Sequence, residues 1–278
     1  AKRNHSGWIK IFLLNMIRGS SLISEVRVKF KYLRPLSFLV LVIVAFCYGC
    51  SREKQEVLVG RDATWFPQQF GIYTSGINAF VNDLVSEINY KEGLNISIVN
   101  QDWVHLFENL DDKKTSGAFT SASPSIEMLA RYQFSDPVLL TGPVLVVLEN
   151  SPYHSLQDLE GKLIGVYKFD SSVLIAQNVP NAVIDSYQHI PVALALEALS
   201  TQRYDALLVP VIEATALVET AYKGRLRIAS EPLNEEGLRL VVLRGGGSDS
   251  LLEGFNAGLA KIRRSGRYKA IKMQSRLP

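Results

Sequence analysis

Short apolar runs alternate with amphipathic helical segments along most of this chain, and no other feature constrains its fold as strongly. The apolar run 57–60 precedes a segment, 78–88, whose apolar residues recur at helical spacing. An alternating run at 95–99 and a helical segment at 103–110 follow, with a weaker strand expected at 118–119. Strands that alternate with helices in this way predict an α/β fold, in which a parallel sheet carries helices on both faces.

The same alternation is repeated further along the chain. Strands are expected at 144–148, 163–166, 182–187, 206–209 and 226–229, and helices at 171–177, 192–199 and 212–221. A strand at 238–243 and an amphipathic helix at 251–262 remain after these two units, so we expect the chain to return to its first lobe. The predicted lobes are 56–141 plus 236–278, and 142–235.

The segment that ends at Cys50 has the pattern of a secretory signal. A basic stretch from Arg27 to Arg34 leads into the uncharged run 35–49, which stops at the small residue Gly49. A cysteine directly after that residue predicts lipid modification of Cys50, a leader over 1–50, and an address outside a bacterial cytoplasmic membrane. With residues 1–27 included, the leader is longer than an ordinary signal peptide. We expect these residues to be absent from the native protein.

Two other interpretations of this segment are open. An uncleaved membrane anchor would need about 20 apolar residues, and the run has about 15. Cys47 and Cys50 form a CxxC pair, but they are the 2 cysteines of the chain, so no further thiol could complete a metal or redox site. Cleavage and lipidation remain the prediction.

The charge of the chain is divided between the leader and the remainder. Residues 1–50 carry 8 basic and 1 acidic side chains, whereas the remaining residues carry 22 and 26. The basic balance therefore belongs to the leader and does not favour nucleic-acid binding. His105, His154 and His189 are isolated and lack metal-ligand spacing, so no metal and no cofactor are expected.

Five segments after the leader carry family motifs in a fixed order. They are Val-Leu-Val-Gly-Arg-Asp-Ala-Thr-Trp-Phe-Pro at 57–67, Phe-Ser-Asp-Pro at 134–137, Ser-Leu-Gln-Asp-Leu-Glu-Gly-Lys-Leu-Ile-Gly-Val at 155–166, Tyr-Asp-Ala at 204–206 and Gly-x-Tyr-x-x-Ile at 266–271. Together they resemble solute-binding protein family 3, the polar amino-acid-binding proteins of ABC importers. The resemblance implies a periplasmic-binding-protein type II fold, with two lobes of mostly parallel sheet, two hinge strands and a ligand in the cleft.

The resemblance also implies a set of ligand-binding residues. Asp62 and Trp65 match positions that hold a ligand's polar group and cover its side chain, and Trp103 matches a second aromatic wall. Ser121 and Ser123 match positions that grip the α-amino and α-carboxylate groups. Alternatively, the tryptophans are core residues, Asp62 caps a turn and the serines are solvated loop residues.

The chain departs from the family pattern at its charged positions. Met128 stands where the carboxylate-binding arginine is expected, and Pro210 stands at the ammonium-binding aspartate. Phe169 and Asp170 replace an anion-binding loop, which puts a negative charge where a carboxylate would lie. Methionine cannot supply the charge-assisted hydrogen bonds of an arginine, so tight binding of a free amino acid needs another cation.

Four further residues complete the expected binding set. Arg61 is the expected replacement cation, and Glu213 is the expected replacement acid. Asp170 and Ser171 join them from the loop before a helix, although Asp170 could instead cap that helix. Arg61 and Glu213 could equally be solvated.

These observations predict a lipid-anchored, monomeric binding protein of an ABC importer, not an enzyme. It would capture an amino acid or a related solute and deliver it to permease subunits. Two alternatives stay open: a sensor or surface protein that no longer transports, and a dehydratase-like or transglycosylase-like enzyme on the same scaffold.

Overall fold

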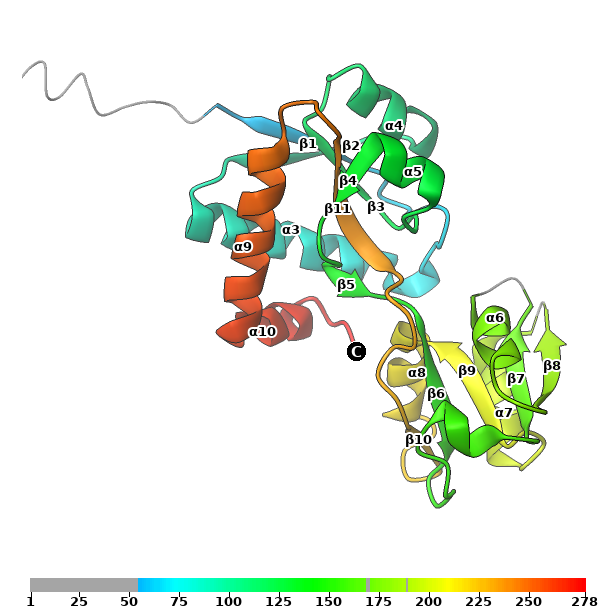
Figure 1. The fold of residues 1–278 in the computed structure, drawn as a ribbon. Helices are drawn as coiled ribbons and strands as arrows, with labels where there is room; N and C mark the ends of the chain where they lie inside the picture. The colour runs from blue at the N-terminus through cyan, green and yellow to red at the C-terminus, as the bar shows by residue number, and fades with distance from the viewer. Residues whose placement is uncertain (1–54, 169–170, 189) are drawn as a thin grey trace, which may run out of the picture. The chain divides into compact units, whose positions relative to one another are not determined.

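The computed structural model describes residues 55–168, 171–188 and 190–278 as α/β structure built on two sheets (Figure 1). The predicted leader, with Cys50, lies outside the described residues. Among the helices that are described, none is long and apolar enough to cross a membrane.

The first sheet has the order β2-β1-β3-β11-β4, and β5 pairs with β11. Its strands are β1 (Val57–Arg61), β2 (Ile96–Asn100), β3 (Gly117–Thr120), β4 (Tyr132–Phe134), β5 (Leu139–Leu140) and β11 (Gly237–Leu243). β1 pairs in parallel with β2 and β3, whereas β11 runs antiparallel to β3, β4 and β5. The associated helices are α3 (Thr74–Glu92), α4 (Trp103–Asp111), α5 (Ile126–Arg131), α9 (Asp249–Arg264) and α10 (Arg267–Gln274).

The second sheet has the order β10-β6-β9-β7-β8. Its strands are β6 (Pro143–Leu148), β7 (Leu163–Tyr167), β8 (Val183–Tyr187), β9 (Ala206–Pro210) and β10 (Leu226–Ile228), and its helices are α6 (Ser172–Gln177), α7 (Val192–Ser200) and α8 (Val211–Val218). β7 is parallel to β8 and β9, and β6 is antiparallel to β9 and β10. The predicted α/β class is confirmed, and each sheet is mixed.

Burial explains why the helices of the first sheet lie where they do. The core cluster combines Phe80 and Leu84 of α3 with Phe119 of β3 and Phe255 of α9, all fully buried. Phe119 and Phe255 are neighbours, with ring centroids 5.7 Å apart. Apolar residues at helical spacing therefore bury one stripe of each long helix against the sheet.

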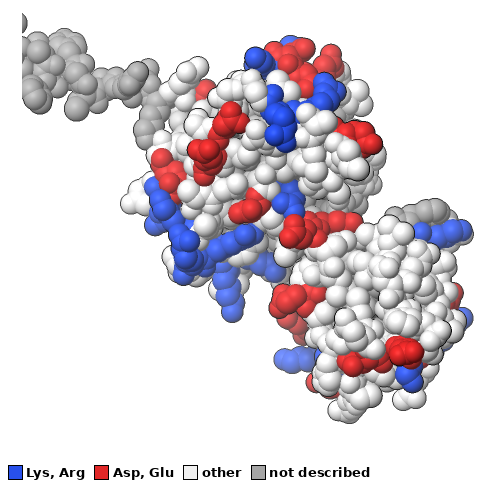
Figure 2. Space-filling view, in the orientation of Figure 1, with Lys and Arg blue, Asp and Glu red and all other residues white. Residues whose placement is uncertain are grey.

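The basic residues that follow the helix predicted at 251–262 include a further helix, α10. Figure 2 shows Lys and Arg side chains gathered over α9 and α10. Two of these cations pair with acids of α3: Lys261 lies 2.8 Å from Glu92, and Arg267 lies 3.1 Å from Glu87. Ile271 is the buried residue of α10. The helix thus adds little apolar burial.

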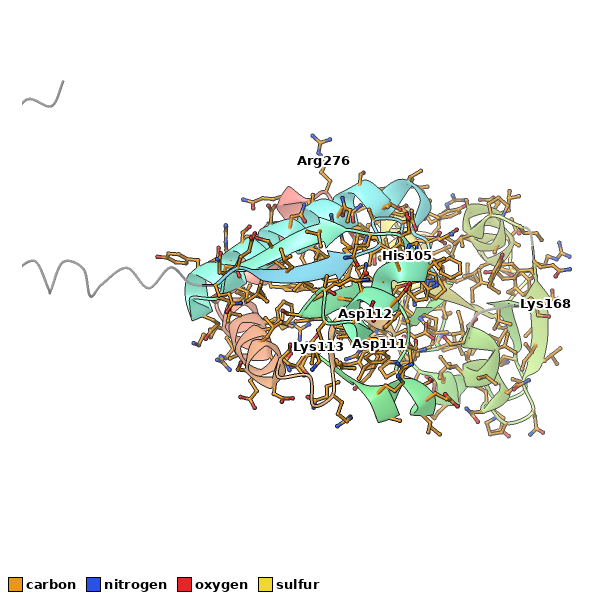
Figure 3. All side chains as sticks on the ribbon, turned by 90° about the horizontal axis from the view of Figure 1, so that it is seen from above. His105, Asp111, Asp112, Lys113, Lys168 and Arg276 are labelled. Carbon is orange, nitrogen blue, oxygen red and sulfur yellow. The ribbon has the colours of Figure 1, made fainter. Side chains whose placement is uncertain are left out.

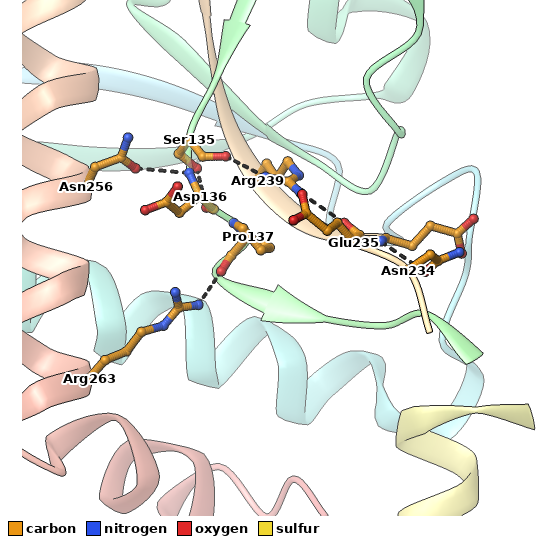
Figure 4. A network of polar contacts seen from close by, with 9 residues as sticks. Ser135, Asp136, Pro137, Asn234, Glu235, Arg239, Asn256 and Arg263 are labelled. Atoms are coloured by element: carbon orange, nitrogen blue, oxygen red, sulfur yellow. Dashed lines mark hydrogen bonds and ion pairs between the residues drawn. The ribbon is translucent and has the colours of Figure 1, made fainter. Parts of the chain in front are cut away.

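A polar network joins the loop between β4 and β5 to β11 and to the segment that returns to it (Figure 4). Arg239 donates to the backbone oxygens of Ser135 and Glu235, at 2.8 and 2.9 Å. The Thr141 amide donates to the Glu236 oxygen at 2.9 Å. Gly237 permits the close approach of β11 to β5, because a Cβ there would collide with the Leu139 carbonyl oxygen. The outgoing and returning segments therefore run side by side.

A second polar cluster joins the end of α4 to β4. Figure 3 labels Asp111 near the end of that helix. Its two carboxylate oxygens accept hydrogen bonds from the Tyr132 hydroxyl at 2.9 Å and from Arg131 at 2.7 Å. Burial, and then the bond to Asp111, raise the pKa of Tyr132 to about 12.

This shifted pKa predicts a loss of stability at high pH. An unfolded tyrosine ionises near pH 10, whereas Tyr132 keeps its proton in the folded state until about pH 12. The contribution of Tyr132 is therefore complete below about pH 10 and is lost as the pH rises toward 12. A Tyr132→Phe variant should show a shallower decline in urea midpoint between pH 9.5 and about 11.5. Equal slopes in the two proteins would contradict the assignment.

Candidate functional site

A cavity of about 780 Å³ is lined by residues from both sheets. The lining consists of Pro67, Gln68, Gln69, Phe70, Tyr73, Ser121, Ser123, Thr141, Tyr167, Ser171, Ile190, Pro191, Val192, Pro210, Ile212, Glu213 and Glu236. A volume of this size is typical of pockets for small molecules.

The cavity lies where strands end. Ser121 follows β3, Tyr167 is the last residue of β7, and Pro210 is the last residue of β9. Loops beyond the carboxyl ends of strands are the usual ligand sites of α/β sheets, because the backbone there leaves the sheet and is free to present side chains. The topology alone therefore favours this cavity as the functional site.

Four of the residues predicted from the sequence line this cavity: Ser121, Ser123, Ser171 and Glu213. Ser123 is exposed, and Ser171 accepts a hydrogen bond from Asn234 at 2.9 Å. Glu213 lies in the first turn of α8. A fifth predicted residue, Asp170, is outside the described residues.

Ser121 fixes the loop that forms one wall. It is 1% exposed. Its hydroxyl donates to the Trp65 carbonyl oxygen at 2.8 Å and accepts from the Gln68 backbone N–H at 3.4 Å. Thr141 adds a bond from its hydroxyl to the Gln68 side-chain oxygen at 2.8 Å. These bonds hold Gln68 in the cavity wall. They show Ser121 bonded to the protein itself, and its predicted role in gripping a ligand stays a prediction.

Trp65 does not line the cavity. It is 1% exposed within the core of the first sheet, and its indole nitrogen donates to the Asn78 side-chain oxygen at 2.9 Å. Asn78 in turn donates to the Ala63 carbonyl oxygen at 3.0 Å. In this arrangement the indole has no exposed face for a solute, which corresponds to the alternative of a core residue.

Arg61 and Asp62 also lie away from the cavity lining. The Arg61 guanidinium donates to the side chains of Asn100 and Asn82, each at 2.8 Å. Both Asp62 oxygens accept from the Thr64 hydroxyl, and one also accepts from the Thr64 amide at 2.9 Å. Asp62 therefore caps a turn, and Arg61 ties β1 to α3 and β2, although both had been predicted to contact the ligand.

Trp103 belongs to an aromatic cluster outside the cavity lining. Its ring centroid lies 5.2 Å from that of Phe66 and 5.4 Å from that of Phe107. Trp103 is half-buried, and the cluster packs against residues beneath α4. Its predicted role as an aromatic wall stays a prediction.

Sequence reasoning missed the aromatic and acidic residues that do line the cavity. Phe70, Tyr73 and Tyr167 supply aromatic surface, and Glu236 supplies a second carboxylate to the lining, in addition to Glu213. The available signal was position in the chain, because Tyr167 directly follows the strand predicted at 163–166 and Glu236 lies just before the strand predicted at 238–243. Phe70 and Tyr73 carried no such signal.

The lining that the structure describes is acidic. Glu213 and Glu236 are its ionisable acids, and no lysine or arginine is among these described residues. Burial raises the pKa of Tyr73, and the charge of Glu213 raises it further. The Glu213 carboxylate thus acts on the phenol of another lining residue. Within the described residues, no group of three or more His, Cys, Asp or Glu could hold a metal ion.

Two of the three departures from the family pattern lie within the described residues, and their surroundings differ. Pro210 lines the cavity. Met128 is half-buried and packs against the cluster that contains Leu106 and Tyr132. The position at which an arginine was expected therefore contributes to the packing of that cluster.

Two relatives that are named as binding proteins match most of the chain. The L-cystine-binding protein TcyJ of Escherichia coli K12 is 25% identical over 223 residues, which cover 79% of this chain and 82% of TcyJ. A probable amino-acid ABC transporter-binding protein of Haemophilus influenzae is 23% identical over 228 residues, covering 80% of this chain and 85% of its own length. Both are described as binding proteins.

Solved structures support the same fold. The L-cystine solute receptor of Neisseria gonorrhoeae, in its unliganded open conformation, is similar with a TM-score of 0.62 at 19% identity. The alignment covers 80% of this chain and 92% of the receptor. The second substrate-binding domain of a putative amino acid ABC transporter from Streptococcus pneumoniae gives 0.57 at 19% identity, covering 80% of this chain and 100% of the domain.

The sequence profile of the bacterial extracellular solute-binding proteins, family 3, matches residues 57–275. This match includes nearly all the described residues and both sheets, as well as the cavity lining. The chain belongs to the bacterial extracellular solute-binding proteins, family 3.

Proposed function

We propose that this protein captures an amino acid or a related small polar solute between two lobes, 56–141 plus 236–278 and 142–235, and delivers it to an ABC permease. One observation carries the proposal: residues from both sheets converge on a single cavity at the ends of their strands. The names of the relatives, which bind cystine or other amino acids, support the solute class.

The proposed mechanism is lobe closure. A solute that contacts both walls of the cavity binds the closed arrangement more tightly than the open one, so it shifts the population toward closure. The connecting segments at Thr141 and Glu236 are joined by a backbone hydrogen bond of 2.9 Å. Rotation would need changes in a few backbone dihedrals of these segments, while each core stays intact.

We further propose an extracytoplasmic location. The leader pattern that ends at Cys50 supports secretion and lipid anchoring. The described cavity offers no metal cluster, and the matched family and relatives are binding proteins. Capture without turnover is therefore the role proposed, and we propose that a monomer without a cofactor performs it.

A thermal-unfolding panel tests solute capture. The full chain, purified in detergent, would be heated with amino acids, their amides, amines, short peptides and organic anions. A true solute at a hundredfold excess over its Kd should stabilise the folded state by about 2.7 kcal/mol. Measured turnover of any solute would favour an enzyme instead, and the absence of stabilisation by every class would contradict capture.

A further inference from the structure

We infer that the solute is a small organic cation, an amine that has no free carboxylate, with its ammonium group held between Glu213 and Glu236. This inference rests on the proposed function and narrows its solute class. It follows from the acidic residues of the described lining, from the positions of the two acids in the chain, and from the contacts that Arg61, Arg131 and Arg239 already make.

The described lining would attract a cation and repel an anion. Glu213 and Glu236 are its charged groups, and the other described members are apolar, aromatic, amide or hydroxyl residues. Closure removes water from such a cavity, which strengthens each charge interaction because the local dielectric falls. A carboxylate enclosed there would bring a further negative charge beside acidic residues, whereas an ammonium group would bring an opposite charge.

Three arginines of the chain have other partners in the described structure. Arg61 is bonded to Asn82 and Asn100, and Arg239 is bonded to the carbonyl oxygens of Ser135 and Glu235. Arg131 pairs with Asp111 at 2.7 Å. None of the three is part of the described lining. A solute carboxylate would therefore meet no arginine fork among these residues.

The two acids come from opposite parts of the chain. Glu213 lies in the first turn of α8, directly after β9 of the second sheet. Glu236 immediately precedes β11 of the first sheet. An ammonium group that bonds to both acids would connect the two sheets, so its binding energy would favour closure. The same contact would thus select the solute and shift the lobes.

The remaining lining suits the apolar part of an amine. Phe70, Tyr73 and Tyr167 offer aromatic surface, and Ile212 offers an aliphatic one. A methylene chain gains from burial against such surfaces, and a cation over an aromatic face gains an additional electrostatic attraction. Gln68 and Gln69 supply amide groups for a second polar end.

Matched pairs of solutes test this inference directly. Agmatine with arginine, cadaverine with lysine, and putrescine with ornithine differ only in the α-carboxylate. Isothermal titration calorimetry on the full chain in detergent would give a Kd for each. We expect the amine of at least one pair to bind ten times or more tightly than its amino acid.

Charge-neutralising variants identify the groups responsible. Glu213→Gln should weaken binding of the preferred amine at least tenfold, and Glu236→Gln should do the same. Glu219→Gln is the matched control, because Glu219 is the exposed C-cap of the same helix and is outside the described lining. It should change the Kd less than twofold. Circular dichroism melts would confirm that each variant is folded. If one of the two cavity variants does not fold, the Kd of the other still tests the inference.

The outcomes separate the inference from the proposed function. If each amino acid binds as tightly as its amine, or if only neutral or anionic solutes bind, the inference is overturned and solute capture stands. Equal losses in the Glu213 and Glu219 variants would also overturn it. If no solute of the wider panel binds, both fail.

Discussion

Replacing Trp65 by alanine is expected to lower the free energy of unfolding by about 3–5 kcal/mol. The side chain is 1% exposed, so the substitution removes a large apolar surface and leaves a cavity in the first core. It also removes the hydrogen bond from the Trp65 indole nitrogen to the Asn78 side-chain oxygen. The Asn78 side chain in turn donates to the Ala63 carbonyl oxygen. Urea unfolding followed by circular dichroism would measure the loss.

The neighbouring Phe66 provides the control. It is 40% exposed and contacts Trp103, so Phe66→Ala should cost about 0.5–1.5 kcal/mol, the range for an aromatic pair. Similar losses in both variants would contradict a core role for Trp65. A Trp65→Ala protein that keeps its stability but no longer binds solute would instead support the ligand role predicted from the sequence.

The strands could be predicted from the sequence where both of their faces are buried. β6 and β9 are apolar almost throughout, because residues on either side of a central strand enter a core. The long helices α3 and α9 were visible for a related reason, since each buries a stripe at helical spacing.

The elements that the sequence did not reveal have little burial. α5 has no buried residue, and α10 buries Ile271 alone. Apolar periodicity is therefore absent from both, although the chain is helical there. Their positions depend on tertiary contacts such as the ion pair between Arg267 and Glu87, which a local pattern cannot show.

The candidate site was only partly predictable because a motif gives a position and not a side-chain direction. Arg61 and Asp62 lie in the expected segment, yet one is bonded to Asn82 and Asn100 and the other to Thr64. Glu213 was found by its place after a strand. Glu236 acquires its place in the cavity from the returning segment, whose path depends on the assembly of both sheets.

Arg239→Met is expected to lower the free energy of unfolding by about 2–3 kcal/mol. Methionine keeps the apolar stem but cannot donate to the Ser135 and Glu235 carbonyl oxygens, and a hydrogen bond from a charged group contributes about 1.5–3 kcal/mol. Burial lowers the pKa of Arg239, which reflects a desolvation cost that methionine would relieve. The expected net loss is therefore smaller than the sum of two such bonds.

Arg244 offers a close comparison for this substitution. It also donates to backbone oxygens, those of Leu129 and Tyr132, but it is exposed, so water can replace the guanidinium in Arg244→Met. That variant should lose less than about 1 kcal/mol, as is usual for surface substitutions. Equal urea midpoints for the two variants would show that the Arg239 fork gives no net stabilisation. A larger loss for Arg239 would assign the extra energy to the bonds between β11, the loop after β4 and the segment that returns from the second sheet, because Ser135 follows β4 and Glu235 precedes β11.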